Sequence, residues 1–92
     1  MSERKIEFDA EKDAANVAKH GISLVRAADL EVLFAHPDRR KEYGEARILA
    51  YGYIDSLPYV LCYVDRGASM RAISLRRAHQ REFLRHGKES QS

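Results

Sequence analysis

Hydrophobic and polar residues alternate in short runs along the chain, and the first runs predict a strand and a helix. Lys5–Phe8 alternates polar and apolar side chains, which is typical of a short strand. Across Ala10–His20, alanines and Val17 recur near the helical period. Asp9 precedes this run as an N-cap, and Gly21 follows it as the left-handed residue that ends many helices.

A second helix is predicted directly after Gly21. Ser23 can cap it, and Pro37 marks where it must have ended. Apolar residues would lie along one face of this helix, namely Leu24, Ala27, Leu30 and Phe34. The two helices would form a hairpin.

Three runs rich in Tyr, Val, Ile and Leu predict three further strands, at Ala46–Ile54, Tyr59–Asp65 and Met70–Arg76. The links Asp55–Pro58 and Arg66–Ser69 have turn composition, so an antiparallel meander is expected. A short basic helix follows Arg77. The predicted order is β-α-α-β-β-β-α, an α+β fold with an antiparallel sheet packed on a helix hairpin.

Side-chain parity sorts the meander residues into two faces, because successive side chains of a strand point to opposite sides. Even positions are apolar and are expected in the core: Ile48, Ala50, Ile54, Val60, Cys62 and Val64. Odd positions give a second face with a cation and four phenols: Arg47, Leu49, Tyr51, Tyr53, Tyr59, Leu61 and Tyr63. In the last strand, Ile73 and Leu75 would join the core, and Ser74 and Arg76 the aromatic face.

The aromatic face has two interpretations. Aromatic rings stack on unpaired bases and arginines hold phosphates, which is how many proteins bind single-stranded RNA. Tyrosine is also favoured on half-exposed strands, where cross-strand pairs stabilise a sheet without any ligand.

The composition of the 92 residues, 45% hydrophobic and 33% charged, suits one small domain, expected over residues 1–87 with a polar tail at 88–92. There is neither an apolar run of the ~18 residues that span a membrane nor an N-terminal signal pattern, so a cytoplasmic protein is expected. Cys62 is the single cysteine and is expected to be a buried, inert thiol. The four histidines are scattered, so no metal site and no cofactor are predicted.

Charge is distributed unevenly along the chain. Up to Asp65 there are nine basic and twelve acidic residues, whereas from Arg66 onward there are seven basic and two acidic. This basic C-terminal third is compatible with a polyanionic partner or with a solvated basic helix.

Two local motifs resemble the BrnT family of bacterial toxins: Lys19–Ile22, which links the predicted helices, and Ile73–Ala78 at the end of the last strand. Further residues match in order and spacing, namely Phe8, Asp9, Lys12, Asn16, Ala27, Ala28, Phe34, Gly44–Arg47, Gly52 and Glu82. The resemblance implies a RelE-like ribonuclease fold. It also implies the toxin of a type II toxin-antitoxin pair, inhibited by a BrnA-like ribbon-helix-helix antitoxin in a heterotetramer with an antitoxin dimer.

Cleavage of RNA without a metal requires the 2′-hydroxyl to lose a proton and the phosphate to be stabilised as charge builds on it. Guanidinium groups suit the second task, so Arg76 and Arg47 are predicted as catalytic residues. His20 and Glu45 are predicted for the proton transfers. The predicted RNA-binding residues are Lys19, Tyr51, Tyr53, Tyr63, Ser74, Arg77 and Arg81.

Several of these residues also have structural interpretations. His20 can cap the carbonyls at the end of its helix, and Glu45 can form a salt bridge with Arg47. His79 and Arg81, on the last helix, are expected to bind RNA phosphate or an acidic antitoxin segment. At the level of the whole protein, the alternative to a ribonuclease is a module of the same fold that binds nucleic acid or a regulator without catalysis.

Overall fold

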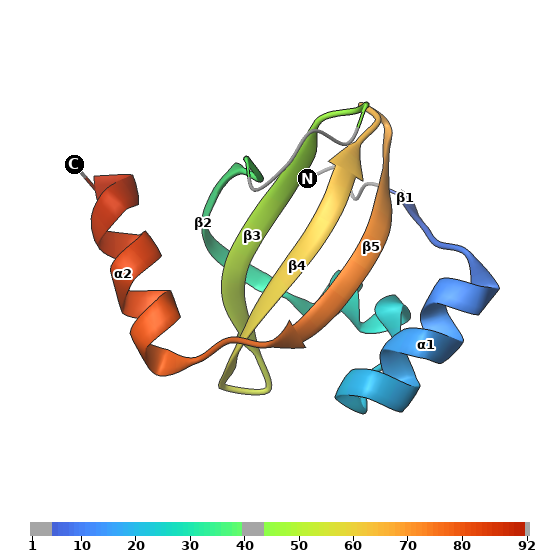
Figure 1. Ribbon diagram of the computed structural model, residues 1–92, viewed down its shortest axis with the longest axis horizontal. Coiled ribbons are helices and arrows are strands. Elements are labelled where there is room, and N and C mark those ends of the chain that lie inside the picture. The colour runs from blue at the N-terminus through green and yellow to red at the C-terminus, as the bar shows by residue number, and fades with distance from the viewer. Residues whose placement is uncertain (1–4, 40–43, 92) are drawn as a thin grey trace.

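The computed structural model describes residues 5–39 and 44–91, with side chains as far as Arg85, and its centre is a five-stranded sheet (Figure 1). The strand order is β1-β5-β4-β3-β2. The strands are β1 (Lys5–Glu7), β2 (Glu31–Pro37), β3 (Arg47–Ile54), β4 (Leu57–Asp65) and β5 (Ser69–Arg77). β1 is parallel to β5 and all other neighbours are antiparallel, so the predicted α+β class and the three-stranded meander are confirmed.

Helix α1 (Ala10–His20) follows the local signals of the sequence. The Asp9 side chain accepts a hydrogen bond from the Glu11 N–H at 2.8 Å. Gly21 adopts the left-handed conformation with φ 73° and donates to the Val17 carbonyl, which ends the helix. Both ends of α1 were therefore predicted correctly.

The predicted second helix, and with it the helix hairpin, is wrong. Ser23 does act as an N-cap, but it starts a short 3-10 helix, η1 (Leu24–Asp29), and the chain then continues as the edge strand β2. In a 3-10 helix residues three apart lie on one side, so Leu24 and Ala27 are buried just as an α-helix would bury them. The i, i+3 pattern was real, but it did not extend to Phe34, which lies in β2.

The two-residue turn at Asp55–Ser56 fixes the register between β3 and β4. Both residues have positive φ, 51° and 67°, as a type I′ turn requires. Ile54 therefore pairs with Leu57, and even positions of β3 pair with odd positions of β4 along the whole hairpin. The predicted faces were consequently wrong for β4: Tyr59, Leu61 and Tyr63 lie on the core side, and Val60, Cys62 and Val64 lie on the opposite side.

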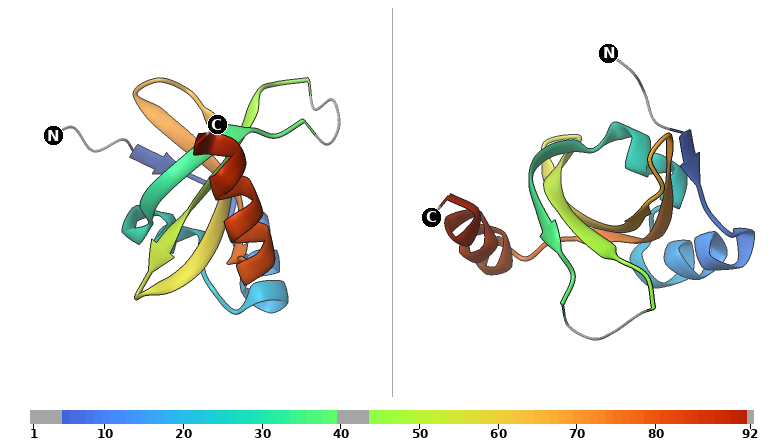
Figure 2. Two further views of the ribbon diagram at one scale, coloured as in Figure 1. Left: turned by 90° about the vertical axis from the view of Figure 1, so that its left-hand side faces the viewer. Right: turned by 90° about the horizontal axis from the view of Figure 1, so that it is seen from above.

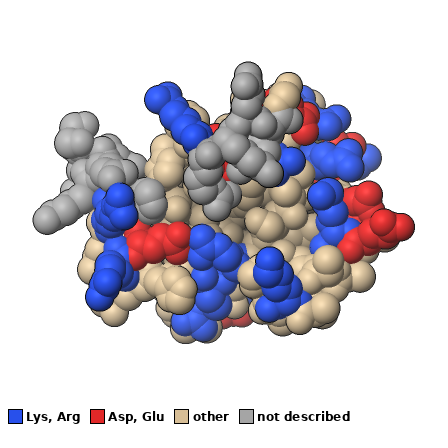
Figure 3. Space-filling view, in the orientation of Figure 1, with Lys and Arg blue, Asp and Glu red and all other residues tan. Residues whose placement is uncertain are grey.

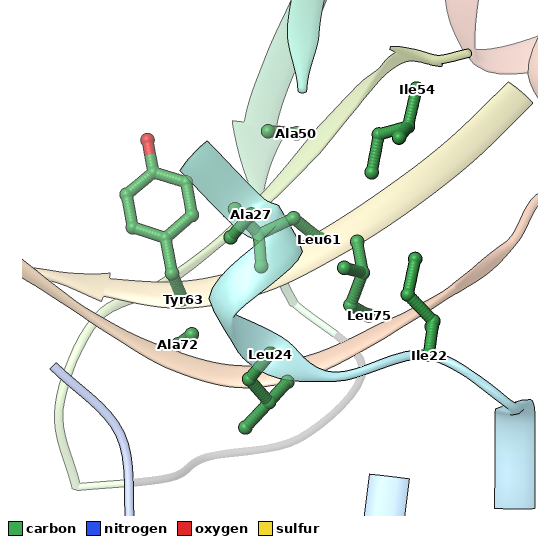
Figure 4. Packing of buried hydrophobic residues seen from close by; sticks show 9 residues of the cluster. All are labelled: Ile22, Leu24, Ala27, Ala50, Ile54, Leu61, Tyr63, Ala72 and Leu75. Atoms are coloured by element: carbon green, nitrogen blue, oxygen red, sulfur yellow. The ribbon is translucent and has the colours of Figure 1, made fainter. Parts of the chain in front are cut away.

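The main core lies between the sheet and η1 (Figure 4). Leu24 and Ala27 of η1 face a set of buried strand residues: Ala50, Ile54, Leu61, Tyr63, Ala72 and Leu75. Of the residues predicted for the core, Ala50, Ile54 and Leu75 are confirmed, and Ile48 packs against the cluster. We call this side of the sheet the inner face, and the opposite side, which carries Leu49, Tyr51, Val60 and Arg76, the outer face.

The sheet curls around its inner face, with α1 alongside β5 and helix α2 (Gln80–Gln91) next to the edge strand β2 (Figure 2). A small second cluster joins α2 to the outer face, where Phe83 and Ala78 pack with Tyr51 and Val60. The basic C-terminal helix was predicted, and it extends into the expected tail, of which Ser92 lies outside the described residues. Among the helices of the described ranges, none is both long and apolar enough to span a membrane.

Candidate functional site

One row of paired residues crosses four strands of the outer face and ends at Arg76. Arg76 of β5 pairs with Val60 of β4, Val60 with Tyr51 of β3, and Tyr51 with Phe34 of β2. Paired side chains of neighbouring strands point to the same face. The row therefore brings together a guanidinium and two aromatic rings from three strands, with Phe34 and Arg76 separated by 42 residues in the chain.

A groove of about 380 Å³ lies over this row. Its lining includes His36, Arg39, Tyr51, Arg76, Glu82 and Arg85. Its lining residues come from the sheet, from the end of β2 with the residues just after it, and from the first turns of α2. It contains more basic than acidic side chains, which suits an anionic ligand.

The Arg76 side chain is half-buried and paired with Glu82 of α2. Its two terminal nitrogens donate to the two carboxylate oxygens of Glu82, at 3.0 and 2.8 Å. The same hydrogen bonds are the main reason that the pKa of Glu82 lies below its ordinary value, although burial acts in the opposite direction. This bidentate pair fixes the plane and the direction of the guanidinium.

Glu82 also fixes the start of α2. One of its carboxylate oxygens accepts a hydrogen bond from the His79 N–H at 3.3 Å, the residue before the helix begins. A glutamate at the third helical position that bonds back to the N-cap N–H is half of a capping box. One carboxylate therefore connects the helix start to the arginine of the neighbouring strand.

Tyr51 is the aromatic floor of the groove and is only 1% exposed. Its ring stacks on Phe34, with ring centroids 4.9 Å apart, and on the His36 ring at 5.5 Å. Phe83 of α2 meets Tyr51 edge-on at 6.2 Å. The imidazole of His36, on β2, is thus held against a rigid ring.

Basic side chains gather across the face seen in Figure 1, near the start of α2 (Figure 3). Arg39 and Arg85 are exposed residues at two sides of the groove. Such a field raises the local concentration of a polyanion and increases its association rate.

Of the predicted catalytic residues, Arg76 lies in the groove, while Arg47 and Glu45 do not line it. Arg47 is half-buried and shares the outer face with Arg76, but it is four residues from Tyr51 along β3, roughly 13 Å at the usual strand rise. Glu45 is exposed at the same end of the sheet and forms an ion pair with Arg66 at 3.9 Å. The two predicted arginines therefore face the same way but are separated along the sheet.

His20 lies at the last position of α1, beside β5. Burial first, and then the positive charges of Lys19 and Arg76, lower the pKa of His20 below its ordinary value. Arg76 acts on His20 because the end of α1 lies near β5. Lys19 is exposed in the same turn.

The predicted RNA-binding tyrosines are divided between the two faces. Tyr51 lies in the groove, and Tyr53, 38% exposed, lies next to α2, where its ring centroid is 5.3 Å from that of Phe83. Tyr63 belongs to the main core and is 8% exposed. The prediction that it shares a face with Tyr51 is wrong, because the two-residue turn reverses the parity of β4.

The remaining predicted contacts lie around the end of β5. Ser74 is half-buried and pairs with Cys62, in the row next to Arg76. Arg77 is exposed, with its guanidinium carbon 5.7 Å from the centroid of the Tyr59 ring, and Arg81 is exposed on α2. Cys62 itself is buried, as expected.

Sequence reasoning missed His36, Arg39 and Arg85 as members of this groove and assigned no role to Glu82. His36 was missed because the segment Glu31–Pro37 was read as helix. Its polar and aromatic residues at even positions, Phe34 and His36, were the signal for a strand with one aromatic face. Arg85 lies three residues after Glu82 on α2 and so shares its helical face, but only the position of α2 brings both onto the sheet.

Among the side chains that the structure describes, in residues 5–39 and 44–85, no group of three or more His, Cys, Asp or Glu gathers as a metal site would require. The groove offers the fixed guanidinium of Arg76, the imidazole of His36 and the carboxylates of Asp38 and Glu82. Together these groups can hold a phosphate and exchange protons with it.

Comparison with protein-family models gives one match relevant to this groove. The model described as the ribonuclease toxin BrnT of type II toxin-antitoxin systems matches residues 8–82. The matched range includes five residues of the groove: His36, Arg39, Tyr51, Arg76 and Glu82. A search of the curated proteins finds no match.

Proposed function

Because the chain belongs to the BrnT family of ribonuclease toxins of type II toxin-antitoxin systems, we propose that RNA is bound and cut in the groove of the outer face. The observation that carries this proposal is the position of Arg76 and His36 in one groove, with the buried Tyr51 ring as its floor. The scissile phosphate lies against Arg76, and the ribose that carries the attacking hydroxyl lies toward His36.

The proposed reaction is attack of the 2′-hydroxyl on the adjacent phosphorus, with departure of the 5′-oxygen and formation of a 2′,3′-cyclic phosphate. The guanidinium of Arg76 stabilises the charge that builds on the phosphate oxygens. The imidazole of His36 takes the proton of the 2′-hydroxyl or supplies one to the leaving oxygen, as imidazoles do at neutral pH. No step requires a metal ion.

The other predicted residues have supporting places in this proposal. Arg47 and Ser74 lie farther along the outer face, both toward the same end of the sheet, where they contact the RNA backbone on one side of the cut. His20, near Arg76, is the second candidate for a proton transfer, and Glu45 is the third. Lys19, Arg77 and Arg81 surround the end of β5 and bind neighbouring phosphates.

Cleavage by the purified protein tests the site. A 5′-labelled single-stranded RNA is incubated with the protein in EDTA, and the products are examined for a cyclic phosphate end. We expect cutting by the wild type and a rate lower by about 10²–10³ for Arg76→Ala. Arg26→Ala, which removes an arginine of η1 that pairs with Asp29 and Asp55, is the matched control and keeps the wild-type rate.

Arg76→Ala also breaks the pair with Glu82, so Arg76→Lys is included to keep the charge while removing the bidentate geometry. Two outcomes contradict the proposal. One is an undiminished cleavage rate in Arg76→Ala. The other is a wild-type protein that does not cut RNA in EDTA and cuts it once a divalent cation is added.

A non-catalytic binding module is the second candidate function, and one observation favours it. The guanidinium of Arg76 is already bonded to both oxygens of Glu82, an arrangement that also suits a purely structural arginine. Wild-type protein that binds RNA in a gel-shift assay but releases no products over hours would establish this candidate.

A type II toxin has a cognate antitoxin, and we propose a BrnA-like ribbon-helix-helix protein that forms a heterotetramer of two toxins and an antitoxin dimer. The complex would act in the cytoplasm, where its RNA substrate is found. Co-expression with such an antitoxin, followed by the measured mass of the complex, tests the partner and the stoichiometry.

A further inference from the structure

A second pocket lies on the other side of the start of α2, next to the groove. We infer that it holds one unpaired base of the RNA, adjacent to the nucleotide whose phosphate meets Arg76. This inference rests on the proposed function and adds to it a base-binding subsite. The pocket has a volume of about 400 Å³, within the range of small-ligand sites.

The walls of the pocket are aromatic and apolar surfaces that the fold leaves open. Tyr53 is 38% exposed and Leu84 is 62% exposed, although both are large apolar residues. The Tyr53 ring rests against Phe83, with an interplanar angle of 37°, so it is supported from one side. A supported ring with an open side is the platform on which proteins stack unpaired bases.

The polar groups of the pocket suit a nucleotide. Arg77 brings a positive charge, and its guanidinium lies over the Tyr59 ring, which restricts its position. Gln80, exposed in the first turn of α2, offers both a donor and an acceptor that can pair with the edge of a base. None of the residues that line this pocket is acidic, in contrast to the groove, which contains Glu82.

The position of the pocket favours RNA as its occupant. Arg76 lines the groove and Arg77, the next residue of β5, lines the pocket, so their Cα atoms are about 3.8 Å apart. On α2, Glu82 lines the groove and the next residue, Phe83, lines the pocket. Tyr51 of the groove and Tyr53 of the pocket are two residues apart on the same face of β3, so a single strand whose phosphate lies at Arg76 can place the neighbouring base against Tyr53.

Binding of uncleavable RNA tests the inference. The probe is a labelled single-stranded RNA with every 2′-hydroxyl methylated, and its Kd is measured by fluorescence anisotropy. We expect Tyr53→Ala to weaken binding about tenfold, the order of a lost base-stacking contact, and Tyr53→Phe to retain wild-type binding because the ring stays. Val17→Ala, which removes an exposed apolar side chain on α1, is the matched control.

Two further measurements separate a base contact from a general loss of structure. Gln80→Ala is a surface change, and we expect it to reduce differences in Kd among poly(A), poly(C), poly(G) and poly(U) probes. For cleavable RNA, Tyr53→Ala is expected to raise KM about tenfold while kcat stays near the wild-type value.

Equal Kd values for Tyr53→Ala and Val17→Ala overturn the inference, and so does an unchanged base preference in Gln80→Ala. A Tyr53→Ala variant that binds RNA normally but loses the antitoxin would make the pocket a protein contact instead. Failure of the proposed function is detected in a different experiment, the cleavage assay, where Arg76→Ala would cut RNA at the wild-type rate.

Discussion

The side-chain amide of Asn16 pairs with the backbone of Leu75 as a neighbouring strand would. Its oxygen accepts from the Leu75 N–H at 3.1 Å, and its nitrogen donates to the Leu75 carbonyl at 2.8 Å and to the Ile22 carbonyl at 2.8 Å. β1 pairs with β5 only over Ser69–Arg71, so α1 supplies the partner that this part of the edge lacks. The residue after Leu75 is Arg76, so Asn16 also fixes the strand from which the proposed catalytic arginine projects.

Asn16→Ala is expected to lower the free energy of unfolding by about 2–4 kcal/mol, because it leaves buried backbone groups of Leu75 without hydrogen bonds. Urea unfolding measures this change, with the exposed Lys12→Ala on the same helix as the control. A loss below ~0.5 kcal/mol would show that water replaces the amide at this edge.

Ser56→Gly is expected to raise the free energy of unfolding by about 0.5–1 kcal/mol. Ser56 has a φ of 67°, a conformation that costs an L-residue energy and that glycine adopts without strain, although glycine loses more entropy on folding. Thermal unfolding should show a higher Tm for Ser56→Gly and no increase for Ser56→Ala. A Tm at or below that of the wild type in both variants would contradict this account of the turn.

Gly52→Ala is expected to destabilise the protein by about 1–3 kcal/mol. A Cβ atom at this position would collide with the backbone carbonyl of Glu31 and approach the Cα of Val32, at the bulge where β2 crosses Gly52. Backbone atoms cannot move aside as the end of a side chain can. The midpoint of urea unfolding measures the effect, and an unchanged midpoint would show that the β2 edge shifts freely.

Glu82→Gln is expected to lower stability at neutral pH and to change its pH dependence. In the folded protein the hydrogen bonds from Arg76 lower the pKa of Glu82 below its ordinary value of 4.5, so the unfolded chain binds this proton more tightly. The stabilisation is present above pH 4.5 and is lost as the pH falls through the folded pKa. Unfolding free energies of the two proteins should therefore differ most near pH 7 and converge in acid.

A constant difference between wild type and Glu82→Gln across this pH range would contradict the role of the ion pair. Glu31→Gln, which removes an exposed carboxylate on β2, controls for the general effect of charge.

His36→Gln is expected to lower the cleavage rate about 10²–10⁴-fold, the usual contribution of a general acid or base. His20→Gln, near Arg76 but outside the groove, is the comparison and is expected to have the smaller effect. The pH dependence of the cleavage rate is measured for each variant. The variant in which a rise or fall of the rate with pH disappears identifies the histidine whose ionisation causes it. A larger loss in His20→Gln would move the proton transfer to the end of α1.

Sequence reasoning identified Arg76 and Tyr51 in the groove, together with the strand that ends at Arg76. It placed Tyr63 on the wrong face and missed His36. Both errors arise from pairing between segments: Tyr63 depends on the register that a two-residue turn imposes, and His36 depends on whether Glu31–Pro37 finds β3 as a partner. Neither is visible in the local pattern.

The sequence by itself determined the elements whose signals act between near neighbours in the chain. The capping of α1 by Asp9 and Gly21, the N-cap at Ser23 and the basic helix after Arg77 depend on hydrogen bonds and charges within a few residues. Only the tertiary structure decided that Glu31–Pro37 is an edge strand, that α2 places Glu82 against Arg76, and that Asn16 completes the edge of β5. The physical reason is that each of these interactions joins residues whose free energy of contact depends on burial and register, and these exist only once the sheet has formed.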